Sequence, residues 1–341
     1  MMIVRPVADQ DLDALLALAR EVDSGMTTFK ADRDALARRI EIACASFGER
    51  IAPPQRDYVF VLEDLAAGQL AGVCAIKAAV GLEEPFYNYR IGTLVHSSRE
   101  LNVFSRMDTL YLSNDLTGSA ELCSLFLHPG YRQGHNGKLL SKSRFLFIAQ
   151  FARLFPERLI AELRGYQRLD GSSPFWESLG RHFFKMDFAK ADDLTAMGKK
   201  SFIAELMPRH PLYVDYLTAE AQGVIGKVHV DTAPAQRLLE QEGLHYEGYI
   251  DIFDSGPVLQ ARTSELRALR ESRLVTVSAG PGEAAAEPLL IANTRLADFR
   301  VVVDSGRPAH GHLELPATVI EAVGGKAGDA LRVMRLSPRR G

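Results

Sequence analysis

The residues most suited to chemistry form one glycine-bearing basic turn, RQGHNGK, at residues 132–138. A run that is typical of a buried strand precedes the turn and ends at Pro129, and a run with a mostly apolar helical face follows it. A turn that opens a helix leaves backbone N–H groups unpaired at the positive end of the helix dipole, where phosphate or pyrophosphate binds. The turn residues that we expect to bind such a group are Arg132, Gly134, Asn136, Gly137 and Lys138.

Three further side chains are candidates for moving protons. His229 follows a Gly-Lys-Val turn and precedes a helix start, and histidine titrates near neutral pH. The alternative for a lone histidine is a capping or surface role. Glu121 and Glu162 lie on or beside two central strands, where either could orient an amine or a water molecule, or be an ordinary strand-end charge.

The composition excludes several classes of protein. The chain has 341 residues, a formal net charge of −3 and no apolar run that approaches a membrane span. This charge argues against a general nucleic-acid binder, although a local basic patch remains at residues 132–144. The three cysteines are widely spaced and form neither a metal pattern nor a disulfide framework, so we expect no metal and a cytoplasmic location.

The pattern along the chain predicts an α+β protein of two parts. Residues 1–277 read as two helices over a strand meander, then the central strand, turn and helix of residues 119–150, and a late helix–Gly–strand unit within 219–257. Residues 199–207 read as a strand, and residues 172–184 as a helix. The composition changes near Ser278, so residues 278–341 are expected to form a small, mostly β, barrel-like subdomain.

The strand, turn and helix resemble the acyl-CoA segment of the GNAT-type N-acyltransferases, whose pattern is Arg/Gln-x-x-Gly-x-Gly/Ala. Arg132 and Gly137 fill the first and last places, whereas His135 stands where the first glycine is expected and Gly134 lies one residue early. The order of two helices, a meander and the central unit is also that of the GNAT fold. The resemblance therefore implies a GNAT-like fold, in which backbone groups around Leu125 and Leu127 pair with the pantetheine arm.

Longer blocks resemble one family, the arginine N-succinyltransferases. The blocks are YVFVLED (58–64), YNYRIGTLVH (87–96), ELNVF (100–104), LSND (112–115), LLSKSRF (139–145), SPFWESLG (173–180), FFKMDF (183–188), FIAELMPRHP (202–211), VIGKVH (224–229) and YIDIFDSGP (249–257). This resemblance implies transfer of a succinyl group from succinyl-CoA to the α-amine of L-arginine, with succinyl-CoA as co-substrate and no permanently bound cofactor. It places a succinyl-CoA contact at Leu125 and the proton-donating histidine at His229.

These substrates carry two carboxylates and a guanidinium. Arg90, in an aromatic cluster, could hold a carboxylate through a bidentate pair, and Asp251 and Asp254 could face the guanidinium. Each of these charges could equally be a solvated surface group.

The resemblance also bears on partners. Some members of the family are made of two related subunits that accept ornithine too. This chain would suit the alpha subunit, so we expect an oligomer.

Two alternative functions stay open. They are a GNAT-type acetyltransferase acting on another amine, and a subunit that is active only with a partner chain. A nucleic-acid-binding role fails on net charge and on the lack of an aromatic-basic platform.

Overall fold

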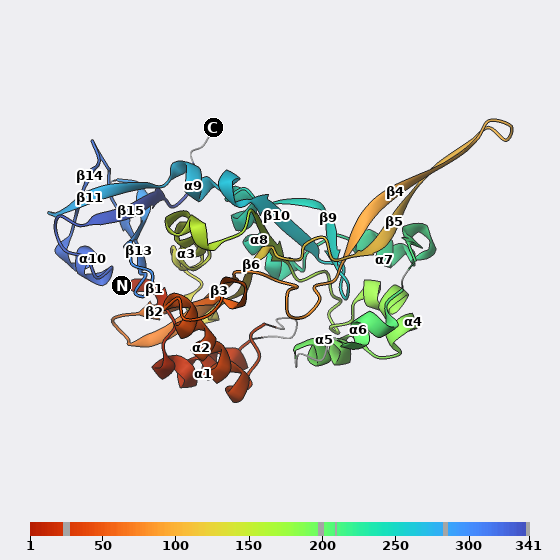
Figure 1. Ribbon diagram of the computed structural model, residues 1–341, viewed down its shortest axis with the longest axis horizontal. Coiled ribbons are helices and arrows are strands. Elements are labelled where there is room, and N and C mark those ends of the chain that lie inside the picture. The colour runs from red at the N-terminus through yellow and green to blue at the C-terminus, as the bar shows by residue number, and fades with distance from the viewer. Residues whose placement is uncertain (23–27, 197–200, 209, 282–285, 339–341) are drawn as a thin grey trace.

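A computed structural model describes residues 1–22, 28–196, 201–208, 210–281 and 286–338. The described strands form one long sheet, in the order β14-β11-β15-β12-β13-β1-β2-β3-β6-β7-β10-β9-β4-β5-β8. Figure 1 shows helices α1 and α2 on one side of the N-terminal strands and α3 on the other. No helix among the described residues is long and apolar enough to cross a membrane.

The first half of the chain supplies the centre of the sheet. Its elements are β1 (Met2–Pro6), α1 (Leu12–Arg20), α2 (Arg33–Phe47), β2 (Asp57–Asp64), β3 (Gln69–Lys77), β4 (Asn88–Ser98), β5 (Val103–Ser113), β6 (Ala120–Leu127), α3 (Asn136–Gln150) and β7 (Arg158–Glu162). The strands β4 and β5 form one long hairpin, which projects from the body (Figure 1).

The second half adds strands at both ends of the sheet. Its elements are α4 (Arg181–Phe184), α5 (Phe188–Ala196), α6 (Ser201–Leu206), β8 (Leu212–Tyr213), α7 (Ala219–Val224), α8 (Ala233–Gln241), β9 (His245–Asp251), β10 (Pro257–Arg262), α9 (Arg267–Glu271), β11 (Arg273–Ala279), β12 (Pro288–Ala292), β13 (Val301–Ser305), β14 (His312–Leu315), α10 (Ala317–Ala322) and β15 (Ala330–Arg335).

The main core forms because β2 is apolar on both faces. Alternate residues of a strand point to opposite faces. Val59 and Val61 pack with residues of α1 and α2, whereas Tyr58 and Phe60 pack with Phe147 of α3. The Phe147 ring lies with its centroid 5.0 Å from those of Tyr58 and Phe60, and the same ring contacts Phe299 of the C-terminal part.

A second core lies under β4 and β9. The expected helix at residues 172–184 is present and includes a π-helical stretch, in which Trp176 stacks on Phe184 at 5.2 Å. The strand expected over residues 199–207 is wrong in the part that is described. Residues 201–206 form α6, and residues 199 and 200 lie outside the described ranges. Ile203 and Met207, four residues apart on one helical face, are both buried in this core.

The C-terminal strands do not close into the expected barrel. They extend the main sheet, because β13 pairs with β1 through Val301 and Val4. Their apolar faces pack on one another and on α10. The strand β11, from 273 to 279, begins before the expected change near Ser278, and the division into residues 1–277 and 278–341 stays a prediction.

We predict that Phe147→Ala destabilises the protein by about 3–5 kcal/mol, because the cavity left by the ring would open between β2, α3 and Phe299. The measurement is urea unfolding followed by circular dichroism. Phe104→Ala is the matched control, since that ring is 73% exposed on the β4–β5 hairpin. Equal losses of unfolding free energy in the two variants would contradict the inference that Phe147 lies at the centre of the main core.

Candidate functional site

The site is a cleft of about 1240 Å³ that opens where β6 and β7 part. The two parallel strands pair only at Ala120↔Leu159 and Glu121↔Ile160, whereas β3 accompanies β6 as far as Leu127. Residues 122–127 line the cleft. Backbone N–H and C=O groups on that edge of β6 therefore face a space in which a ligand can take the place of a neighbouring strand.

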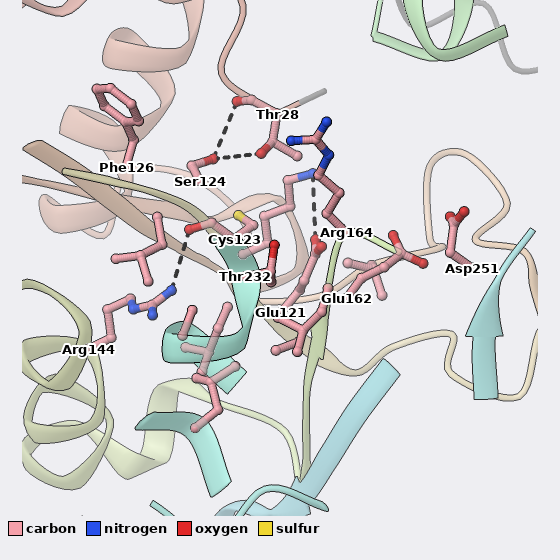
Figure 2. Close-up of a pocket in the computed structure, with 18 of the residues that line it drawn as sticks. Thr28, Glu121, Cys123, Ser124, Phe126, Arg144, Glu162, Arg164, Thr232 and Asp251 are labelled. Atoms are coloured by element: carbon pink, nitrogen blue, oxygen red, sulfur yellow. Dashed lines mark hydrogen bonds and ion pairs between the residues drawn. The ribbon is translucent and has the colours of Figure 1, made fainter. Parts of the chain in front are cut away.

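A bulge redirects β6 inside the cleft. Ser124 has a φ of 52°, and the register with β3 shifts between Val73 and Ala75. The Ser124 hydroxyl lies 2.9 Å from Thr28 Oγ1 and accepts a 2.8 Å hydrogen bond from Arg39 Nη1. Figure 2 shows these contacts with Thr28 and, on the other side of the strand, Arg144 reaching the Cys123 carbonyl at 3.4 Å. The bulge is therefore held from both sides.

The helix α3 begins at the mouth of the cleft. Its N-cap residue is His135, and no described side chain caps it. Gly134 has a φ of 57°, in the region that favours glycine. Arg132 donates through Nε to the Leu127 carbonyl at 3.1 Å. Lys138 donates through Nζ to Ser337 Oγ of the C-terminal part at 3.3 Å. The glycine one residue early thus still gives a turn in which the amides of Gly134, Gly137 and Lys138 are left for a ligand, whereas the Asn136 amide donates to the Gln133 carbonyl at 3.3 Å.

The expected ligand-binding residues mostly meet here. Those that line the cleft are Leu125, Leu127, Arg132, Gly134, Gly137 and Lys138. Asn136 is not among the lining residues and donates instead to the Tyr131 carbonyl at 3.0 Å, so it shapes the turn.

The expected basic patch at residues 132–144 is wrong in its second half, because Lys142 and Arg144 are buried. Glu242 accepts from Lys142 Nζ and from Arg267 Nη2, each at 2.8 Å, and all three side chains are at most 3% exposed. Burial lowers the pKa of Lys142, and the Glu242 carboxylate opposes that effect. This buried triad ties α3 to the end of α8 and to α9.

Acidic side chains gather at the inner end of the cleft, where Figure 2 shows Glu121, Glu162 and Asp251 around one space. Glu121 is buried, lies 3.8 Å from Lys77 Nζ, and raises the pKa of that lysine. Glu162 accepts from Asn88 Nδ2 at 3.1 Å. This end of the cleft is thus suited to a cationic substrate.

Asp254 has a structural task beside this group. Its two carboxylate oxygens accept from the backbone N–H groups of Gly165 at 2.7 Å and Gly256 at 2.8 Å. Burial raises the pKa of Asp254 well above its ordinary value, and nearby Asp251 adds to the effect. A Cβ on Gly165 would lie 2.4 Å from the Asp254 carbonyl, so the two segments approach too closely for another residue.

His229 lies on the segment that runs beside the residues following β7. Its backbone N–H donates to the Arg164 carbonyl at 2.9 Å, and Val228 bridges to Gly165. The side chain is 17% exposed, and its Nδ1 accepts from the Asp231 N–H at 3.3 Å. Asp231 and Thr232, which follow it, line the cleft. His229 itself is not among the residues that line the cleft, and it adjoins the cleft through these two neighbours and through the Arg164 backbone.

Arg90 is not brought into this group. It is 60% exposed, 3.8 Å from Asp115, and above the Tyr249 ring, and it does not line the cleft. The sequence reasoning instead missed Lys77 and Arg164, which do line it. The signal for Arg164 was a charged residue two positions after a buried strand that ends in Glu162. No group of three or more His, Cys, Asp or Glu side chains suited to a metal occurs among the described residues.

We predict that Glu242→Met lowers the free energy of unfolding by about 3–5 kcal/mol, because Lys142 and Arg267 would stay buried without their carboxylate. The control is Glu271→Gln, since Glu271 also pairs with Arg267 but is 40% exposed. Urea unfolding of both variants measures the difference. A loss no greater than that of the control would show that the triad does not stabilise this part of the fold.

Comparisons with known proteins agree across the whole chain. A family model described as "Arginine N-succinyltransferase beta subunit" matches residues 2–268, and a model of the C-terminal domain of that subunit matches 273–335. Curated arginine N-succinyltransferases of Escherichia coli O139:H28 and Shigella flexneri are each 50% identical over 337 residues, which is 98% of either chain.

A solved structure gives the same result. The arginine/ornithine succinyltransferase subunit AI from Pseudomonas aeruginosa superposes with a TM-score of 0.90 at 35% identity, and the match covers 99% of both chains. The expected α+β class is confirmed, with a large open sheet in place of the barrel. The subunit names of these relatives differ, so the comparisons assign the family and not the alpha type. The chain belongs to the arginine N-succinyltransferase family.

Proposed function

We propose that this protein transfers the succinyl group of succinyl-CoA to the α-amine of L-arginine. The observation that carries the proposal is the parting of β6 from β7, which leads from an acidic inner end to the uncapped start of α3. A long ligand with a pyrophosphate at one end and a thioester at the other fits this order of groups. Curated arginine N-succinyltransferases that are 50% identical over 98% of this chain support the same substrates.

The binding of the acyl carrier follows from the geometry. In the proposal the pantetheine amides pair with the open edge of β6 around Leu125 and Leu127, in the manner of an added strand. The pyrophosphate binds the amides of Gly134, Gly137 and Lys138, with the Arg132 and Lys138 side chains beside it. The bulge at Ser124 turns the following backbone groups toward the thioester end.

The chemistry then needs three proton movements. The α-ammonium of arginine loses a proton to Glu121 or Glu162, and the free amine attacks the thioester carbonyl carbon. As the tetrahedral intermediate collapses, its nitrogen loses a second proton to the solvent and the C–S bond breaks, and His229 donates the proton that converts the departing CoA thiolate to a thiol. Asp251 contributes negative charge near the guanidinium. The products are N2-succinyl-arginine and CoA.

We also propose an oligomeric enzyme in the cytoplasm, with a related beta subunit as one form of partner. The similar chain from Pseudomonas aeruginosa is named as a subunit, and the cysteines here, Cys44, Cys74 and Cys123, are all free. Light scattering of the purified chain, alone and mixed with such a subunit, measures the assembly.

The test of the function is thiol release by the purified chain. We expect release with succinyl-CoA and arginine, and little with acetyl-CoA or with lysine. Release with acetyl-CoA that equals release with succinyl-CoA would favour a general acetyltransferase. If the chain alone is inactive but succinyl-CoA raises its melting temperature, the activity belongs to a complex with a partner subunit.

For His229 we predict that His229→Ala lowers kcat by about 10²–10⁴-fold and leaves the affinity for succinyl-CoA within about threefold, because only the proton donor is removed. Stopped-flow thiol release and calorimetry measure the two quantities. His245→Ala serves as the control, since that side chain is 56% exposed and pairs with Glu247. Unchanged turnover in His229→Ala would remove this residue from the mechanism.

A further inference from the structure

The guanidinium of Arg164 lies at the point where substrate charge must be recognised. Arg164 is the second residue after β7 and lines the cleft, and Figure 2 shows it near Glu121 and Glu162. Its backbone is fixed, because its carbonyl accepts from His229 and the next residue, Gly165, donates to Asp254. The side chain therefore starts from a rigid position in the middle of the site.

The hydrogen bonding of Arg164 is incomplete. Its Nη2 donates to Gln167 Oε1 at 2.5 Å, whereas the buried Nε has no hydrogen-bond partner among the described residues. Gln167 is itself 6% exposed, which fixes the guanidinium in one orientation. A buried donor without a partner costs free energy, so it marks a place where a ligand acceptor completes the network.

The donors that remain have a specific geometry. Gln167 takes one of the two N–H groups of Nη2, so the Nε N–H, the other Nη2 N–H and the Nη1 donors remain, and two neighbouring nitrogens of a guanidinium bind a carboxylate through two parallel N–H···O bonds. Among the described carboxylates none forms an ion pair with Arg164, although Glu121 and Glu162 share its cleft. Glu121 lies beside Lys77, and Glu162 accepts from Asn88.

We infer that Arg164, oriented by Gln167, binds a substrate carboxylate and thereby sets specificity. The inference rests on the proposed function, and it gives Arg164 the carboxylate-binding role that the sequence predicted for Arg90. Two carboxylates are available, the distal one of the succinyl group and the α-carboxylate of arginine. Both present the same acceptor pair to the guanidinium edge.

The experiment measures binding by calorimetry with two pairs of compounds, which differ in whether they carry the carboxylate. Succinyl-CoA is compared with butyryl-CoA, and arginine is compared with arginine amide in the presence of CoA. Arg164→Met should weaken the binding of one carboxylate-bearing compound about 10- to 100-fold, and the binding of its analogue without the carboxylate less than about threefold. Arg164→Lys, which keeps the charge and loses the planar fork, should lie between.

The pair that responds identifies the carboxylate, and a selective loss in either pair supports the inference. Equal loss for the charged and uncharged members of both pairs, or no loss in either, overturns it. Arg153→Met is the control, because Arg153 is 69% exposed, pairs with Glu49 and does not line the cleft. Melting temperatures confirm that each variant folds.

Binding is read separately from turnover, so the two proposals can fail independently. Wild-type protein that releases no thiol from succinyl-CoA with arginine, both alone and mixed with a related beta subunit, contradicts the proposed function. The ratios of dissociation constants for the charged and uncharged compounds still decide the role of Arg164 in that case.

Discussion

The separation of two parallel strands is the constraint on which this structure depends. A strand in the middle of a sheet normally pairs on both edges, because unpaired backbone groups away from water cost free energy. Here β6 pairs with β3 from Glu121 to Leu127, interrupted by the bulge at Ser124, and loses β7 after Glu121. The cleft between the parted strands thus has a row of backbone donors and acceptors along β6. Charged side chains lie where the strands part, Glu121 near the start of β6 and Glu162 and Arg164 at and just beyond the end of β7.

Such an opening persists only if its surroundings are rigid. Arg39 and Arg144 hold the bulge at Ser124 from two sides. The triad around Glu242 fixes α3, and with it the phosphate end, to the segment that follows His229. Buried ion pairs contribute little net stability against apolar packing, but they enforce one arrangement because each partner is costly to leave alone. The triad therefore holds the two ends of the cleft in a fixed position relative to each other.

The sequence was most informative where the pattern is local. The strand, the basic turn and the helix of residues 119–150 were predictable from apolar spacing, Pro129 and the glycines, as were the helix at 172–184 and the late helix within 219–257. Lys142 and Arg144 were misjudged as surface charges because their partners lie elsewhere in the chain, at Glu242 and at the Cys123 carbonyl. The barrel was wrong for the same reason. Pairing of β13 with β1 joins distant parts of the chain and leaves no local signal.

The roles of His229 and Leu125 came from the family resemblance, since neither residue is distinctive by itself. Arg164 could not be selected from the sequence, because its importance depends on a missing hydrogen-bond partner and on the position of Gln167. Charged residues at strand ends are common, and only the fold shows which of them face a common space.

The most direct test of this account is hydrogen–deuterium exchange of the purified chain with and without succinyl-CoA. If the open edge of β6 and the start of α3 bind the ligand, amides in residues 122–127 and 134–138 should exchange more slowly in the complex. Exchange in the projecting β4–β5 hairpin should stay unchanged. Binding that is detected by calorimetry but slows exchange at neither segment would contradict the placement of the acyl carrier in this cleft.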